Sequence, residues 1–279
     1  MPEIHDVANA FDDISVTEAY TGAYLFKAQF STFNGASPDG SVSQRRVISV
    51  APGITMPARG VITALEETCL VGFGTVDGIF DRAIRQSFWT KRVTDILKKV
   101  TPGEAALGST GVTVLGHKTY LKDTVNTGTN ADYDPFWEIY FSPSENVVKG
   151  DFFKVGTTYY RVRSSHLDIS GFTNAASDEL DSGARVSITF TETGAYNPVT
   201  DTFNAASTAI YGMFFDRYKL YEQLTAADRA NMAGDMTAVV AKSSITPVVG
   251  RTCTVDSRTW TILNITAISD AWEIHLRRS

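Results

Sequence analysis

The histidines are the first residues of this chain that could perform acid–base or metal chemistry. There are four of them: His5, His117, His166 and His275. Metal sites usually take two ligands from adjacent turns of a helix or from one short loop, and no two of these histidines have that spacing. We therefore expect each histidine to lie at a surface or at the rim of a strand. The sequence predicts no metal site and no cofactor.

One segment is rich in oxygen-bearing side chains that could surround a calcium ion. Its candidate ligands are Asp123, Asn126, Asn130, Asp132 and Asp134. A calcium-binding loop usually follows an ordered D-x-D-x-D-G pattern and ends in a bidentate Glu, and this segment does neither. We interpret it as a solvated turn in preference to a calcium site.

Nucleotide and acyl-transfer chemistry have no motif in the sequence. The glycines of Gly72-Phe73-Gly74 and of Thr75-Val76-Asp77-Gly78 could suggest a phosphate loop, but no Gly-Lys-Ser/Thr follows them. There is no G-x-S-x-G elbow with a matching His and acid. Glycoside hydrolysis needs two facing carboxylates, and nothing marks such a pair. We predict that the chain is not an enzyme, with an unmarked carboxylate pair as the enzymatic alternative.

Three tryptophans could form a platform for a sugar ring. Trp137, Trp260 and Trp272 all lie in segments whose apolar and polar residues alternate. Alternation is typical of a strand with one buried face, so we expect these side chains to pack in a core.

Composition and charge exclude several classes of partner. The chain has 279 residues, of which 43% are hydrophobic and 20% charged, and its formal net charge is −6. An acidic chain has no basic surface for gripping nucleic acid. The segment from Met1 to Asp6 lacks the pattern of a signal peptide. The sequence has no run of about 18 apolar residues that would predict a membrane span, so we expect no membrane partner. Cys69 and Cys253 are expected to be buried free thiols in a reducing compartment.

The elements that would position any site are β-hairpins, and one hairpin pattern occurs three times. Residues 150–162 align without a gap with residues 250–262, and a weaker copy starts at Gly60. Each copy reads as a glycine, a short strand, a polar turn and a return strand. We expect Val155 and Val255 to precede the turns and Tyr160 and Trp260 to point into their own cores, because they share a register.

These hairpins predict a mainly β fold of two or three small barrel or sandwich modules, with short helices and an extended N-terminal arm. The expected divisions are an arm over residues 1–45 and β modules over 46–105, 106–195 and 196–279. Residues 83–91 could be a strand or the start of a helix. Residues 168–183 are rich in Ser, Asn, Asp and Gly and predict a long loop, and residues 224–234 predict one helical turn.

The last eighty residues carry a series of motifs that resembles one known family. The motifs are Ile210-Tyr211-Gly212-Met213-Phe214-Phe215-Asp216-Arg217-Tyr218, Gly234-Asp235, Pro247-Val248-Val249-Gly250 and Val255-Asp256-Ser257-Arg258-Thr259-Trp260-Thr261-Ile262. Gly150-Asp151 and the hairpin that follows them fit the same pattern. This series resembles the head–tail joining proteins of tailed bacteriophages, also called stopper or head-completion proteins, which form a small β-barrel. Arg251 and Ser257 depart from the family pattern, and the resemblance covers about half of the chain.

The resemblance implies a structural protein of the virion neck, made in the host cytoplasm, without catalytic residues. Its implied partners are a portal or adaptor protein, a tail tube or tail-terminator protein, and other copies of itself in a ring of six or twelve. Genomic DNA would pass through the ring without sequence-specific binding. Within the predicted arm, Tyr20, Tyr24, Phe26 and Phe30 are the candidate partner-docking residues. The alternative is a carbohydrate- or receptor-binding β-module of a tail fibre or cell surface.

Overall fold

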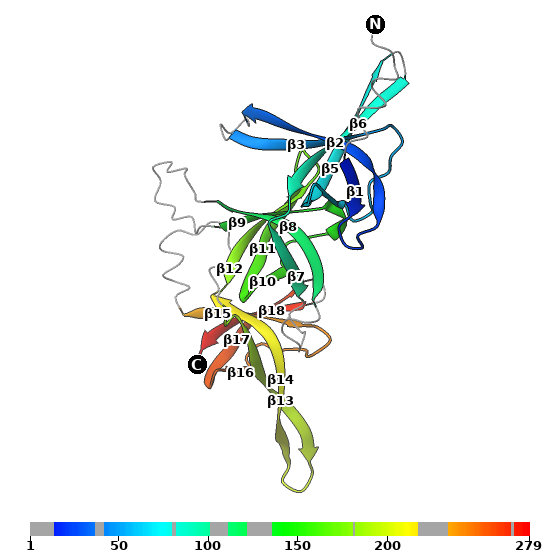
Figure 1. Cartoon of the computed structure of the whole chain (residues 1–279). Helices are drawn as coiled ribbons and strands as arrows, with labels where there is room; N and C mark the ends of the chain where they lie inside the picture. Colours follow the sequence, from blue (N-terminus) through cyan, green and yellow to red (C-terminus); the bar gives the residue numbers. More distant parts are fainter. Residues whose placement is uncertain are drawn as a thin grey trace, which may run out of the picture.

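The chain folds into three closed six-stranded antiparallel barrels that lie in a row in chain order (Figure 1). The computed structural model describes residues 14–36, 42–79, 82–100, 111–121, 136–180, 182–216, 234–268 and 271–279. The predicted mainly β fold with small barrel modules is confirmed. The helix found in the described residues is one short 3-10 turn, η1 (Pro143–Glu145), and no helix among these residues is long and apolar enough to cross a membrane.

Each barrel is built from consecutive strands. The first contains β1 (Ile14–Glu18), β2 (Tyr24–Ala36), β3 (Val42–Val50), β4 (Val61–Ala64), β5 (Glu67–Ile79) and β6 (Arg82–Arg92). The second contains β7 (Asp95–Val100), β8 (Val112–Leu121), β9 (Phe136–Phe141), β10 (Phe152–Val155), β11 (Thr158–Leu167) and β12 (Thr173–Leu180). The third contains β13 (Arg185–Asn197), β14 (Thr202–Asp216), β15 (Asp235–Ala241), β16 (Thr252–Val255), β17 (Arg258–Ile268) and β18 (Ala271–Arg278).

The three barrels share one topology. If the strands of each barrel are numbered one to six along the chain, their order around the barrel is one, two, three, six, five, four in every case. Residues 93–94 and 181–184 are the connections between consecutive barrels. The chain is therefore a tandem repeat of one small barrel, joined by short connections.

The predicted hairpins at 150–162 and 250–262 are confirmed and have the same main-chain hydrogen bonds. The Gly150 amide donates to the Val162 carbonyl at 2.9 Å, and the Gly250 amide donates to the Ile262 carbonyl at 2.8 Å. Val155 and Val255 are the last strand residues before the turns. Asp256 and its neighbour have positive φ, which a tight two-residue hairpin turn requires.

The weaker third copy is also a hairpin, shifted by one residue from the glycine-based alignment. The Val71 amide donates to the Gly60 carbonyl at 2.8 Å, as the Val162 amide does to the Asp151 carbonyl at 2.9 Å. Gly60 thus corresponds to Asp151 and not to Gly150. In all three hairpins the return strand has an irregularity directly after the corresponding residue, between Val71 and Gly74, between Val162 and Ser164, and between Ile262 and Asn264. Bulges of this kind bend a strand so that a small barrel can close.

The interiors of the barrels repeat position by position. Strand registers place Val16, Leu97 and Ile188 at one site, and all three are fully buried. On the second strand, the inward site two residues beyond the direct cross-strand partner holds Ala28, Gly116 and Gly212. A side chain at Gly116 or Gly212 would lie 2.7 Å from Leu97 or Val240 respectively, which is why this site takes the smallest residues.

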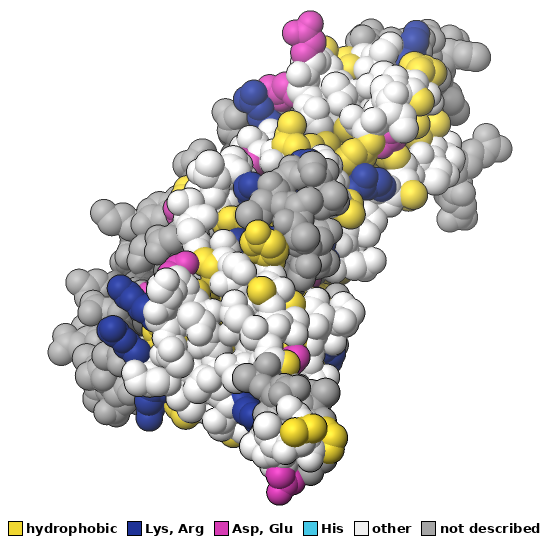
Figure 2. Space-filling view, turned by 90° about the horizontal axis from the view of Figure 1, so that it is seen from below, with side chains coloured by type: hydrophobic (Ala, Val, Ile, Leu, Met, Phe, Trp, Pro, Cys, Tyr) yellow, Lys and Arg dark blue, Asp and Glu magenta, His cyan; other side chains and the backbone are white. Residues whose placement is uncertain are grey.

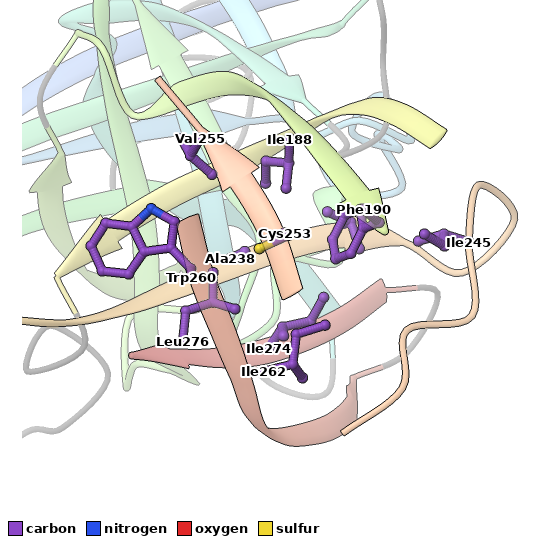
Figure 3. Close-up of a cluster of buried hydrophobic side chains, with 11 residues drawn as sticks. Ile188, Phe190, Ala238, Ile245, Cys253, Val255, Trp260, Ile262, Ile274 and Leu276 are labelled. Atoms are coloured by element: carbon purple, nitrogen blue, oxygen red, sulfur yellow. The ribbon is translucent and has the colours of Figure 1, made fainter. Parts of the chain in front are cut away.

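The inward cross-strand pair of each hairpin is made of residues whose sizes differ from barrel to barrel. The inward pair is Ile62 with Cys69 in the first barrel, Phe153 with Tyr160 in the second, and Cys253 with Trp260 in the third. Tyr160 and Trp260 lie in the cores of their own barrels, as expected. Figure 3 shows Trp260 in the core of the third barrel. Both cysteines are buried free thiols, and burial raises the pKa of the Cys253 thiol to about 12.

The predicted extended arm is wrong for the part of it that the structure describes. β1, β2 and β3, which begins at Val42, all belong to the first barrel, and Val16, Phe26 and Ala28 lie in its core. Residues 1–13 and 37–41 lie outside the described residues. The other predicted boundaries are shifted, because β7 opens the second barrel and β13 opens the third, although both had been placed at the ends of the preceding modules.

Two local predictions are corrected or decided. Residues 173–180, expected within a long loop, form β12, whose Asn174, Ser177 and Asp178 are buried. Residues 83–91 lie in strand β6 and not in a helix. The predicted helical turn at 224–234 lies almost wholly outside the described residues.

Candidate functional site

The three histidines that the structure describes lie on different strands and do not come together. His117 lies on β8, where Nδ1 donates to the Arg92 carbonyl at 2.8 Å and Nε2 is 3.0 Å from the Thr119 hydroxyl. Burial, with a smaller contribution from Lys91, lowers the pKa of His117. His166 is in β11 opposite Asn174, and His5 lies outside the described residues. Among the residues that the structure describes, no group of His, Cys, Asp or Glu is arranged to hold a metal.

The fourth histidine takes part in a cluster at the end of the third barrel. Asp235 on β15 is buried, and its carboxylate accepts two hydrogen bonds from Arg277, at 2.9 and 3.0 Å. His275 Nε2 lies 2.7 Å from the same carboxylate. The hydrogen bond and charge of Asp235 raise the pKa of Arg277. The carboxylate is engaged by the Arg277 guanidinium and the His275 ring, both on β18, so this cluster ties β15 to β18.

The glycines and tryptophans considered for ligand binding are packed or hydrogen-bonded within the barrels. The suggested phosphate-loop glycines lie within β5, where a side chain at Gly74 would come within 2.5 Å of the Phe88 ring. Trp260 is buried, the Trp272 indole donates to the Ile245 carbonyl at 2.9 Å, and the Trp137 indole donates to Glu179 at 2.7 Å. The calcium-loop candidates lie outside the described residues.

The predicted docking residues do not form one surface. Phe26 is in the core of the first barrel, because it lies on the inward face of β2. Tyr20 lies at the contact between the first and second barrels. Tyr24 is 61% exposed, and Phe30 lies in β2 opposite Ile48. Of the three whose side chains are described, only Tyr24 is open to a partner.

The contact between the first and second barrels, which we call the first junction, is apolar with a polar border. Val61 and Leu70 pack against Leu115 and Phe172. At the border the Arg59 guanidinium donates to Glu145 at 2.7 Å and lies 3.6 Å from the centre of the Tyr20 ring.

Tyr20 is fixed at this border by two hydrogen bonds. Its hydroxyl donates to Glu145 at 3.3 Å and accepts from the Leu115 amide at 3.3 Å. Burial, together with the Glu145 charge, raises the pKa of Tyr20 to about 12. A neutral phenol is thus retained across the physiological pH range, and it can bridge the two barrels as both donor and acceptor.

The second junction, between the second and third barrels, contains buried charges. Val100, Phe152, Tyr159 and Leu180 pack against residues of the third barrel, namely Ala184, Met213, Phe215, Val239 and Ala271. Beside them Arg161 donates to Glu273 at 3.3 Å, and Arg163 pairs with Asp178. Burial lowers the pKa of Arg161. Arg161 and Glu273 belong to different barrels, so their pair ties the second barrel to the third, whereas Arg163 and Asp178 both lie in the second barrel.

Two-stranded ribbons extend beyond the barrels and offer strand edges for assembly (Figure 1). The longest is formed by β13 and β14, which pair from Arg185 with Met213 to Asn197 with Thr202. In the described ladders β14 pairs with β15 only from Met213 onward, and β13 pairs with β16 only at residues 188–190. The outer parts of both strands therefore present main-chain donors and acceptors at open edges.

The visible surface has no single charged region. Figure 2 shows Lys and Arg side chains interspersed with Asp and Glu, and apolar side chains in separate patches. Comparisons of the chain with protein-family models, with curated proteins and with solved structures found no match. The features that the described residues offer for a function are the two junctions within the row and the projecting ribbons.

Proposed function

We propose that this chain is a structural virion protein that joins the head or portal of a tailed bacteriophage to its tail. The observation that carries the proposal is the third barrel. The segment whose motifs resemble the stopper proteins, together with β13 and the start of β14, forms one complete closed barrel. The same barrel is repeated twice upstream, so the likeness of the second hairpin to the family pattern has the same structural basis.

Rigidity along the row of barrels supports a joining role. A connector has to transmit a fixed geometry between two assemblies. Apolar packing and charge pairs occupy both junctions, including Arg59 with Glu145 and Arg161 with Glu273. Short connections between barrels leave little freedom for bending.

The ribbons support assembly into a ring. An open strand edge can accept a strand of a neighbouring subunit through main-chain hydrogen bonds. The β14 edge over residues 202–212 contains no Lys, Arg or Pro, the residues that commonly block strand addition. In the proposed ring of six or twelve copies, neighbouring chains contact one another at these edges, with a portal or adaptor on one side and a tail tube or terminator on the other.

The experiment is deletion of the gene in a phage that encodes this chain, followed by electron microscopy of the lysate. DNA-filled heads and separate tails are the expected result. Complete virions that fail to adsorb would contradict the joining role and favour a receptor-binding module. The packing of Trp260 within its barrel gives that alternative no aromatic platform at this position.

A further inference from the structure

The two junctions are the same contact made twice. We call the side of a barrel that faces the following barrel its outgoing face. We identified corresponding residues by counting along each strand from the core residues that occupy the same site in the three barrels. Four positions on the outgoing face correspond in this way in all barrels. They hold Ala19, Val61, Leu70 and Val93 in the first barrel and Val100, Phe152, Arg161 and Leu180 in the second. Seven of these eight side chains pack in the apolar clusters of the junctions, and Arg161 pairs across the second junction.

The receiving sides correspond as well. We call the side that faces the preceding barrel the incoming face. Three corresponding positions hold His117, Tyr140 and Phe172 in the second barrel, and Met213, Val239 and Ala271 in the third. Tyr140 and Phe172 lie in the first junction, and all three residues of the third barrel lie in the second junction. One outgoing face and one incoming face thus make a modular contact.

At the end of the row, the outgoing face of the third barrel carries hydroxyls at all four positions. The corresponding residues are Thr191, Thr252, Thr261 and Ser279. They bond one another across the strands, because Thr252 donates to Thr191 at 3.3 Å and the hydroxyls of Thr261 and Ser279 are 2.7 Å apart. Covering these hydroxyls with another barrel would remove them from water, which costs free energy, and would bury no apolar side chains at these four positions in return.

The incoming face of the first barrel, which no described barrel covers, is polar too. Its three corresponding residues are Gln29, Ser49 and Arg85. Ser49 is buried and hydrogen-bonded to Ser87 at 3.1 Å, and Arg85 is exposed. Both ends of the row therefore lack the apolar side chains that the internal faces use.

We propose that the chain is a capped array of three barrels, in which polar residues at both ends prevent a second copy from continuing the row. Without caps, the contact would join the end of one copy to the start of the next, and such a head-to-tail contact produces open filaments. In the proposed ring, contacts between copies would then be made along the sides of the row. The capping of the two ends does not rest on the proposed function.

The test restores one half of the junction at each end in separate full-length variants. One variant carries T191A, T252V, T261L and S279V, which are the outgoing residues of the first barrel. The other carries Q29H, S49Y and R85F, which are the incoming residues of the second barrel. Circular dichroism and a thermal melt check that both remain folded.

Light scattering after size-exclusion chromatography then measures association. The expected result is a one-to-one complex in the mixture of the two variants, with an affinity at least about tenfold above that of either variant for wild type. No gain in association over wild type would overturn the proposal, since the substituted positions would not be what prevents stacking. End-to-end cross-linking between chains that carry only Ser279→Cys and Arg85→Cys would also overturn it.

Discussion

The relation in size between Cys253 and Trp260 can be tested by placing a phenylalanine at each position, which gives a pair of similar size to Phe153 and Tyr160 in the second barrel. Trp260 is 6% exposed and its ring lies 5.3 Å from that of Phe214, so Trp260→Phe leaves a small cavity. Loss of about three ring atoms should cost about 1–2 kcal/mol. Cys253 is completely buried, and Cys253→Phe alone should overpack the core at a cost of about 1–3 kcal/mol.

In the double variant the new phenyl ring occupies space that the indole has left. The two side chains are cross-strand partners, so the combined cost should be smaller than the sum by about 1 kcal/mol or more. Native-state hydrogen exchange of the β16 and β17 amides measures the opening free energy of this barrel separately. The matched control is Cys69→Phe combined with Trp260→Phe, which should be additive because the residues lie in different barrels. Additivity of both pairs within about 0.5 kcal/mol would refute the reasoning.

Three further predictions concern the junction charges, the histidine and the small core site. Glu273→Ala should destabilise the second junction by about 3–5 kcal/mol because it leaves Arg161 buried without this partner, and Arg161→Met in the same chain should recover most of the loss; urea unfolding of both variants checks this. The lowered pKa of His117 means that folding favours the neutral ring, so this contribution to stability is complete above the unfolded pKa of 6.5 and is lost as the pH falls toward the folded pKa. Melting temperatures from about pH 8 to pH 5.5 should therefore fall less in His117→Gln than in wild type. Parallel melting curves for the two proteins would contradict a lowered pKa at His117. Gly116→Val should destabilise the second barrel by about 1–3 kcal/mol or more, because its side chain would meet Leu97, whereas the same change at Gly183, which has nothing within 4 Å, should have little steric cost in a thermal melt.

The sequence predicted the hairpins because their signals are local. The segments around Gly156 and Asp256 place short polar turns between alternating strands, and such turns fix the register of the strands that they join. The inward direction of Tyr160 and Trp260 followed from this register.

What could not be predicted depends on contacts between distant segments. β12 is polar in sequence, and its strand is stable because Asp178 pairs with Arg163 and Leu180 is covered by the third barrel. The N-terminal segment reads as an arm because the partners that bury Phe26 come much later in the chain. The threefold repeat is hidden because corresponding core sites hold residues as different as Cys69 and Trp260.

Two of the candidate docking residues are packed within the chain and are not available to a partner. Tyr20 and Phe26 were expected to reach a partner, and both are used within the chain. Contacts with other proteins are therefore expected on the ribbons and on exposed side chains such as Tyr24. These surfaces come from segments whose strand edges are open, a property that depends on topology and not on residue type.

The joining role is tested most directly by cryo-electron microscopy of the neck of a virion that encodes this chain. We expect repeated copies of a three-barrel row between the portal and the tail, each fitting the density as one rigid body, with neighbouring copies in contact along their sides. Density for the chain at a fibre tip, or its absence from the particle, would contradict a joining role at the neck.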